Sequence, residues 1–216
     1  AELERFAKEY KEKIGLPFSC LISPMSVTEE KMAMMVDAGL IYVQMGVESA
    51  STRMQELFNR KMMHNGRMME AIRIINSFKA RLYPPSYDFL LDVPGETDSD
   101  IIDSLHFISD IPKPYRLQPF ELIPYPGTEM YRLAKEKGLI EDEHRQIYNR
   151  SYTMRKVTYL NLLFALCRTG HFPHALLKIL LSKPALLCLN SRTARPFIRL
   201  IYSSGKALRK KRRRIC

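Results

Sequence analysis

Carboxylates and glycines stand where two apolar, β-branched runs of the sequence end. Gly46 and Glu48 lie at the end of the run over residues 40–47. Asp88 lies inside a second run, residues 87–93, between a Tyr and a Phe. A glycine lets a ligand come close to the backbone, and a carboxylate among apolar side chains is costly unless it meets a partner or a ligand. Gly46, Glu48 and Asp88 are therefore candidates for a site that binds a polar ligand.

Two proline–glycine turns follow runs of the same kind. The sequence PGET (94–97) follows the second run, and PYPGT (124–128) follows a further run over residues 116–123. Each signal also has a plain structural interpretation. Glu48 could cap a helix or lie in a solvated loop, Asp88 could pair with an Arg of the fold, and proline–glycine turns occur in any protein.

The elements that must position these residues alternate between strand and helix. We expect strands at 18–23, 40–47, 87–93 and 116–123, and helices at 2–14, 26–39, 65–78, 97–108 and 128–137. A capping box of Ser26 and Glu29 is expected to start the second helix. Such alternation predicts parallel βαβ units, in which ligands bind beyond the carboxyl ends of the strands. The candidate residues follow strands and fit this rule.

The expected sheet is small for a parallel sheet. The chain opens in a helix, and only three or four strands can be predicted, which is too few to close a barrel. Parallel strands are normally covered on both faces and paired on both edges. We therefore expect further strands before Ala1. The alternative is a small open α/β sheet that is complete as it stands.

Composition and charge divide the chain into two parts. Apolar residues make up 46% of the 216 residues and charged residues 26%, which excludes disorder throughout. Residues 1–150 hold 19 Lys and Arg against 23 Asp and Glu, whereas residues 151–216 hold 15 Lys and Arg and no acidic residue. No apolar run reaches the length of a spanning helix. The four cysteines lie far apart, which argues against a zinc site or a disulfide framework and favours a reducing, cytoplasmic compartment.

The order and spacing of the motifs resemble a known family. The segments GVESASTRMQELFNR (46–60), YDFLLDVPGETDSD (87–100) and PYPGTEMYRLAKEKG (124–138) resemble the second half of a radical S-adenosylmethionine (radical SAM) enzyme. The segment IPKPYRLQPFELIPYPGTEMY (111–131) is similar to the cobalamin-binding group of that family, many of whose members are methyltransferases. The resemblance implies an α/β fold, the C-terminal half of a partial (β/α)6 barrel over residues 1–148.

The resemblance also implies cofactors and a reaction. A four-iron four-sulfur cluster, held by a CxxxCxxC loop, would ligate S-adenosylmethionine and cleave it to a 5′-deoxyadenosyl radical, with cobalamin as a further cofactor. This chain has no CxxxCxxC, so we expect the metal ligands and the cobalamin domain outside it and the chain alone to be inactive. The alternative is a non-catalytic α/β interaction module. The substrate is not indicated by any residue.

Residue roles carry over by motif position. Glu48 matches a residue that contacts the cofactor, and Gly46 precedes it where the backbone comes close. Arg60, twelve residues after Glu48, matches an Arg near the methionine carboxylate, and Asp88 matches an Asp on the ribose side. Ser23 matches a polar residue of the preceding strand; Leu21 is the other position for that residue and has no polar group.

The basic C-terminal part is expected to form a separate region. We predict a helical extension over residues 149–204 and a disordered polybasic tail over 205–216, with seven cations between Lys206 and Arg214. Three interpretations remain open: packing within the enzyme, contact with an anionic membrane surface, or nucleic-acid binding. The last is the least favoured, because aromatic residues are not interleaved with the final basic run.

Overall fold

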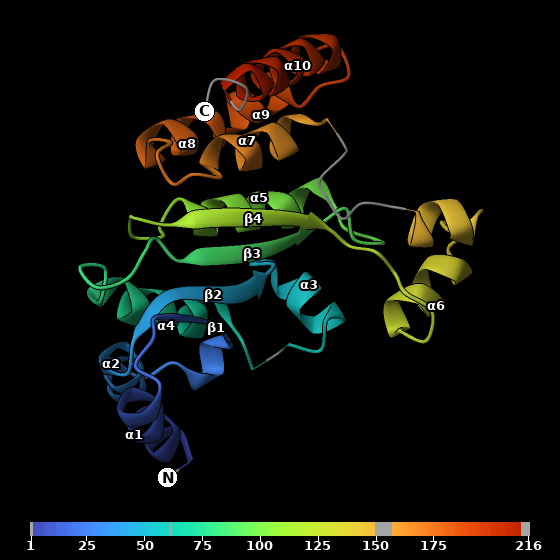
Figure 1. Ribbon diagram of the computed structural model, residues 1–216. Helices are drawn as coiled ribbons and strands as arrows, with labels where there is room; N and C mark the ends of the chain where they lie inside the picture. Colours follow the sequence, from blue (N-terminus) through green and yellow to red (C-terminus); the bar gives the residue numbers. More distant parts are fainter. Residues whose placement is uncertain (1, 61, 150–156, 213–216) are drawn as a thin grey trace.

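A four-stranded parallel sheet forms the centre of the protein. The computed structural model describes residues 2–60, 62–149 and 157–212, and side chains as far as Ser203. The strands are β1 (Phe18–Ile22), β2 (Leu40–Glu48), β3 (Ser86–Leu91) and β4 (Arg116–Glu121), in the order β1-β2-β3-β4 and parallel throughout (Figure 1). The predicted α/β fold with a parallel sheet is confirmed, and the strand ends differ from those expected by one or two residues.

Helices connect the strands and form the C-terminal part. Those of the first part are α1 (Glu2–Lys13), the 3-10 turn η1 (Pro24–Ser26), α2 (Glu29–Asp37), α3 (Thr52–Leu57), α4 (Asn65–Ser77), α5 (Asp98–Ile108), α6 (Glu129–Glu136) and the π-turn η2 (His144–Tyr148). Those of the second part are α7 (Tyr159–Cys167), α8 (His174–Leu180), α9 (Lys183–Leu189) and α10 (Arg195–Arg212).

The capping residue predicted for α2 is wrong. The Thr28 hydroxyl, not that of Ser26, accepts the Lys31 N–H at 3.2 Å and caps the helix. The Ser26 hydroxyl donates to the Ser23 carbonyl instead, within η1. The physical reason is that Pro24 starts a separate turn, so that the cap of α2 lies two residues later than expected. Thr97 and Thr128, the first residues of two of the predicted helices, hold the N-cap positions of α5 and α6.

The two faces of the sheet differ in polarity because side chains alternate along each strand. One face is buried under α2, α4 and α5 and forms the core, with Val43, Met45, Tyr87, Phe89 and Leu117 almost fully inaccessible. The other face carries polar side chains that are only partly buried. Its polar residues are Tyr42, Gln44 and Glu48 on β2, Asp88 on β3 and Gln118 on β4; Gly46, Leu90 and Phe120 lie among them.

The C-terminal helices pack against the β4 side of the sheet (Figure 1). The Leu117 N–H of β4 donates to the Arg168 carbonyl at 2.8 Å, so the chain after α7 covers an edge that would otherwise be free. Phe164 of α7 packs edge-on against Phe89, with ring centroids 5.5 Å apart. The extension thus docks on β4 and α5, within the chain.

The tail prediction needs a correction. Residues 205–212, expected to be disordered, continue the helix α10, while residues 213–216 lie outside the described residues. A helix can continue here because Ala207 and Leu208, with the Lys and Arg around them, are good helix formers. The proposed boundaries between the three regions stay a prediction.

Candidate functional site

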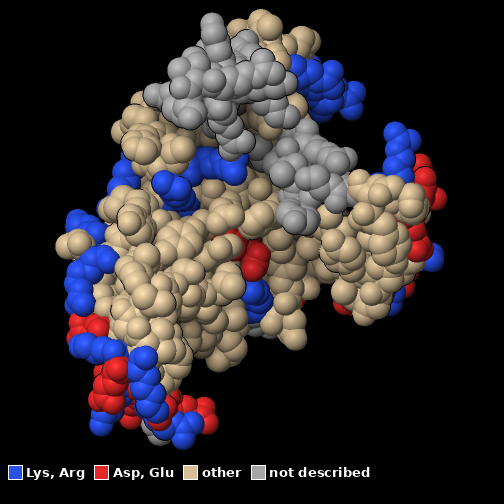
Figure 2. Space-filling view, in the orientation of Figure 1, with Lys and Arg blue, Asp and Glu red and all other residues tan. Residues whose placement is uncertain are grey.

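The candidate residues gather at the carboxyl ends of β2 and β3. Gly46 of β2 is the register partner of Asp88 on β3, and Glu48 lies two residues beyond it on the same face. Figure 2 shows acidic and basic atoms meeting in the middle of this face, surrounded by uncharged surface. The sheet therefore brings the two predicted carboxylates to one place.

The end of β2 is irregular, and the irregularity changes the direction of the Glu48 side chain. The register with β3 shifts between Gly46 and Glu48, and the backbone of Glu48 has a φ of 63°. A non-glycine residue in this left-handed region costs about 1–2 kcal/mol, and such residues concentrate at functional sites. A bulge at a strand end re-aims a side chain. The helix-cap interpretation of Glu48 is wrong, since Ser51 holds the N-cap position of α3.

Arg60 reaches back to Glu48 across the loop that contains α3. Asn59 ends that helix with a φ of 55°, and the Arg60 N–H donates to the Gln55 carbonyl at 2.7 Å. One Arg60 nitrogen lies 3.3 Å from Glu48 Oε1, and another donates to the Gly46 carbonyl at 3.3 Å. The short helix α3 thus brings Arg60 back to Glu48, twelve residues before it in the chain.

Gly46 is required by this arrangement. A Cβ built on Gly46 would lie 2.4 Å from Glu48 Oε1 and 3.8 Å from an Arg60 nitrogen. Contacts under 3.0 Å force a shift, so any other residue would displace the Glu48 carboxylate from its position beside Arg60. The structure therefore brings Gly46, Glu48 and Arg60 together, as the motif spacing predicts.

Asp88 is held by an amide rather than by an arginine. The Gln44 amide donates to Asp88 Oδ2 at 2.6 Å, while Asp88 Oδ1 is buried and accepts no hydrogen bond from the described residues. The interpretation of Asp88 as the partner of a structural Arg is not supported. Gln44 was missed by sequence reasoning, although it stands two residues before Gly46 and must share its face.

Burial controls the charge of both carboxylates. It raises the pKa of Glu48 above its ordinary value, and Asp88 adds to the increase while Arg60 opposes it. Burial likewise raises the pKa of Asp88, partly offset by the hydrogen bond from Gln44. Within the described part of the chain, Arg60 pairs with Glu48 alone, and Asp88 is held only by the Gln44 amide, so the site is short of positive charge and of hydrogen-bond donors. A ligand that carries both would be favoured here.

Ser23 lies at the same edge of the sheet but serves a local purpose. It follows β1, and its hydroxyl accepts the Met25 N–H at 3.3 Å as the cap of η1. No contact joins Ser23 to Glu48 or Asp88 among the hydrogen bonds of the described residues. Leu21, with 77% of its surface exposed, shares the polar face through its pairing with Gln44. The cofactor role of Ser23 stays a prediction.

A second polar cluster, which sequence reasoning missed, joins the loop after β2 to the turn after β3. The buried Asp100 carboxylate accepts hydrogen bonds from the Ser51 hydroxyl at 2.6 Å and from the Thr97 N–H at 2.8 Å, and it forms an ion pair with Arg53. Arg53 also donates to the Gly95 carbonyl at 2.8 Å. This Asp100 cluster fixes the PGET turn against the segment that follows Glu48.

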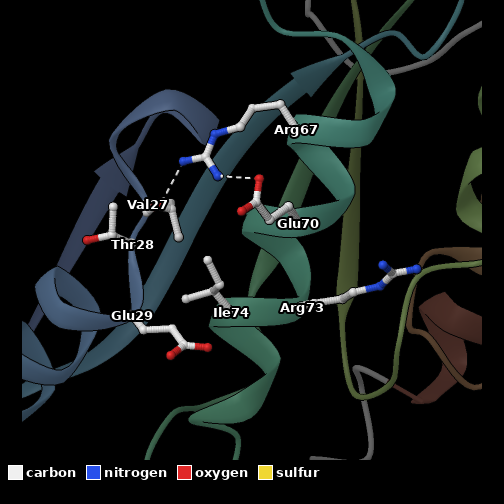
Figure 3. A pocket seen from close by; sticks show the side chains of 7 residues that line it. All are labelled: Val27, Thr28, Glu29, Arg67, Glu70, Arg73 and Ile74. Atoms are coloured by element: carbon white, nitrogen blue, oxygen red, sulfur yellow. Dashed lines mark hydrogen bonds and ion pairs between the residues drawn. The ribbon is translucent and has the colours of Figure 1, made fainter.

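A separate pocket lies away from these residues, between the first turn of α2 and α4 (Figure 3). Its volume is about 470 Å³. The Arg67 guanidinium on its wall is already engaged, since it donates to the Val27 carbonyl and pairs with Glu70 (Figure 3). The pocket contains none of the predicted site residues.

The part of the chain that the structure describes offers neither a metal site nor a membrane-spanning helix. Within residues 2–60, 62–149 and 157–212, no group of three His, Cys, Asp or Glu side chains is placed to hold a metal ion. Over the same part of the chain, no helix combines the length and apolar character needed to cross a membrane.

Comparisons with known proteins give the family. The chain is 33% identical over 133 residues to bacteriochlorophyllide d C-8(2)-methyltransferase of Chlorobaculum tepidum, an alignment that covers 60% of this chain and 28% of that protein. The chain thus spans under a third of the length of this relative.

Two solved structures are similar in fold. Coproporphyrinogen III oxidase from Escherichia coli, a radical SAM enzyme, aligns with a TM-score of 0.51 at 16% identity over 62% of this chain and 31% of its own. The methyltransferase TsrM from Kitasatospora setae, solved with cobalamin and a [4Fe-4S] cluster, aligns with a TM-score of 0.51 at 14% identity over 62% of this chain and 27% of its own. Both likenesses confirm the predicted α/β fold of the radical SAM barrel.

The sequence profile of the Radical SAM superfamily matches residues 1–108, half of the chain, and includes β1 to β3 with Glu48, Arg60 and Asp88. The chain belongs to the radical SAM superfamily.

Proposed function

We propose that the protein acts as a radical SAM methyltransferase, or performs closely related radical chemistry, with S-adenosylmethionine bound at the carboxyl ends of β2 and β3. The observation that carries the proposal is the Glu48–Arg60 pair beside the unpartnered Oδ1 of Asp88. The family and the methyltransferase relative support the reaction class.

The residues present fit S-adenosylmethionine. The ligand carries a carboxylate, an ammonium, a sulfonium cation and ribose hydroxyls, and the site offers a guanidinium and two carboxylates. Gly46 leaves open the space that a Cβ would fill, and Asp88 Oδ1 lacks the donor that a ribose hydroxyl would supply. When bound, this cofactor and the cluster supply the radical chemistry of the family.

Each residue then has a physical role. Arg60 presents a fork of donors, of which two are used on Glu48 and Gly46, so further N–H groups can bind the methionine carboxylate. Glu48 holds the guanidinium in place and adds negative charge near the cationic part of the ligand. Gln44 fixes one oxygen of Asp88 and leaves the other for the ribose. The partial burial of both carboxylates limits the access of water.

The residues present do not fit the iron–sulfur cluster. The sequence contains no CxxxCxxC, and its four cysteines, Cys20, Cys167, Cys188 and Cys216, lie far apart. We therefore propose that the ligands of the cluster are residues outside this chain. We likewise propose that cobalamin is bound by a domain outside this chain, because residues 111–131 resemble the cobalamin-binding group.

The experiment that tests the proposal is the binding of S-adenosylmethionine to the intact protein. We expect Arg60→Ala to weaken binding by about 1.5–3 kcal/mol, the range for a hydrogen bond to a charged group, which is roughly 10- to 150-fold in Kd. Arg81→Ala is the matched control, because Arg81 is ion-paired with Asp37 at 2.6 Å on the surface and away from the site.

Two outcomes would count against the proposal. Equal affinity of the Arg60 and Arg81 variants would leave Arg60 a purely structural residue. Absence of any binding to the intact, anaerobically reconstituted protein would favour the non-catalytic interaction module.

A further inference from the structure

The C-terminal helices carry positive charge that the chain does not neutralise. Residues 151–216 contain 15 Lys and Arg and no Asp or Glu, so only acidic residues of the first part could pair with them. One such pair forms within the described residues, between Lys178 and Asp110 at 2.8 Å. Among the described side chains, the other basic residues of the extension are exposed and form no ion pair; they are Arg168, Lys183, Arg192, Arg195 and Arg199.

Large apolar side chains lie exposed beside these cations. On α10, Phe197, Leu200 and Ile201 are three and four residues apart and therefore share one side of the helix. Phe197 is 59% exposed and Leu200 63%, whereas Ile198 is 2% exposed and belongs to the core, and Ile201, at 38%, lies between the two sides. The exposed stripe is thus separate from the side through which α10 docks. Leu187 on α9 is exposed still further, at 81%.

These two features together fit one kind of partner. Figure 2 shows basic atoms over the C-terminal helices with no acidic atoms among them on this face. A surface that combines unpaired cations with exposed aliphatic side chains complements an anionic bilayer, which attracts the charge and accepts the apolar groups. We infer that α9 and α10 form a docking surface for a membrane that contains anionic lipid.

Nucleic acid is the less suitable partner. Single-stranded nucleic acid is bound by aromatic side chains on which bases stack. Over the described residues 157–203, Phe197 is the one aromatic residue among the strongly exposed apolar side chains, and the others are Leu and Ile. Burial of such aliphatic side chains in lipid is favourable, but they offer no surface on which bases can stack.

The experiment measures sedimentation of the intact protein with lipid vesicles. One set contains phosphatidylcholine alone, and the other contains one third phosphatidylglycerol. We expect binding to the anionic set only, and a loss of that binding as salt rises from about 0.1 M to about 0.5 M, because screening shortens the range of exposed charges.

Three variants connect the result to the surface. Arg192→Glu with Arg199→Glu should weaken binding to the anionic vesicles at least about tenfold, and Phe197→Ser with Leu200→Ser should weaken it as well, because the apolar contact with the bilayer is lost. Lys8→Glu with Lys79→Glu makes the same change of net charge at exposed positions of the first part and should change binding less than about twofold. Thermal unfolding by circular dichroism verifies that each variant is folded.

The inference is independent of the proposed function, because it does not involve S-adenosylmethionine. Equal binding of the protein to neutral and anionic vesicles would overturn it, as would equal losses in the Arg192/Arg199 and Lys8/Lys79 variants. Tighter binding to a single-stranded oligonucleotide than to anionic vesicles at the same salt would assign the surface to nucleic acid instead.

Discussion

Glu96 of the PGET turn has a pKa that the fold moves into the neutral range. Its side chain accepts the Asp92 N–H at 2.7 Å, and Asp92 itself has a left-handed backbone with a φ of 59°. Burial raises the pKa of Glu96 to about 7, against an ordinary value of 4.5, and the hydrogen bond from Asp92 only partly offsets this. The folded protein therefore holds this proton more tightly than the unfolded chain does.

The stability of the protein should consequently depend on pH through Glu96. Because the folded state binds the extra proton, the free energy of unfolding falls as pH rises from about 4.5 to about 7 and then levels off. Glu96→Gln keeps an acceptor for Asp92 and removes the charge. Relative to the wild type, we expect this variant to gain up to about 3 kcal/mol between pH 5 and pH 8, measured by urea unfolding.

A matched control is available at Glu129. This residue is exposed, and its hydrogen bond with Arg132 lowers its pKa, so it stays ionised in both states over the same pH range. The difference between Glu129→Gln and the wild type should therefore stay constant from pH 5 to pH 8. A Glu96→Gln variant that behaves in the same way would contradict the role given to burial.

At the scale of elements, the Asp100 cluster is what joins the loops of neighbouring strands. Burial alone would favour the neutral acid, but the hydrogen bonds from Arg53, Ser51 and Thr97 outweigh it and hold the pKa of Asp100 well below its ordinary value. The stability it contributes is present above the unfolded pKa of about 4 and is lost only in strong acid.

Removing this carboxylate should loosen both loops. We expect Asp100→Ala to lower the free energy of unfolding by about 2–4 kcal/mol at neutral pH, less than for a fully buried ion pair, because Arg53 is half exposed and can be solvated. Asp103→Ala, at an exposed position of the same helix, should change stability by about 0.5 kcal/mol at most. Similar losses in the two variants, measured by denaturant unfolding, would show that the cluster contributes little.

The elements also show which parts of the site the sequence could predict. Alternation placed Gly46, Glu48 and Asp88 on strands, since the two-residue period fixes which side chains share a face. The contact of Gln44 with Asp88 could not be predicted, because it depends on the register between β2 and β3. Periodicity carries no register information for parallel strands joined by long crossovers. Arg60 was found through the family motif, and its position follows from a turn at Asn59 that no pattern indicated.

At the scale of the whole molecule, the difference in charge between residues 1–150 and 151–216 indicated a separate C-terminal extension but not the surface on which it docks. The contact surface includes a backbone hydrogen bond, buried apolar side chains from α7, α8 and α10 and the Lys178–Asp110 ion pair, and such tertiary packing has no local signature. One residue of the sequence is important for this docking. Gly170, between α7 and α8, has a φ of 71° and lies against the backbone of Tyr115. This glycine permits the close approach of the extension to β4.

Gly170 therefore provides a test of the docking. A Cβ at this position would lie 2.3 Å from the Tyr115 carbonyl oxygen, which is backbone and cannot move aside cheaply. Gly138 has nearly the same φ, 64°, but nothing within 4 Å of its Cβ position. Gly138→Ala thus measures the cost of the left-handed backbone alone, about 1–2 kcal/mol, and Gly170→Ala should lose about 1–3 kcal/mol more through overpacking.

The location of the damage can be measured as well as its size. If the extension is displaced, the Leu117 amide loses its acceptor on Arg168, and its hydrogen exchange should accelerate in Gly170→Ala but not in Gly138→Ala. Amides of β2, which is separated from β4 by β3, should keep their protection in both variants, because the core under that strand does not depend on the extension. Loss of protection in β2 and β4 together would mean that the sheet and the C-terminal helices unfold as one unit rather than as a sheet with a docked extension.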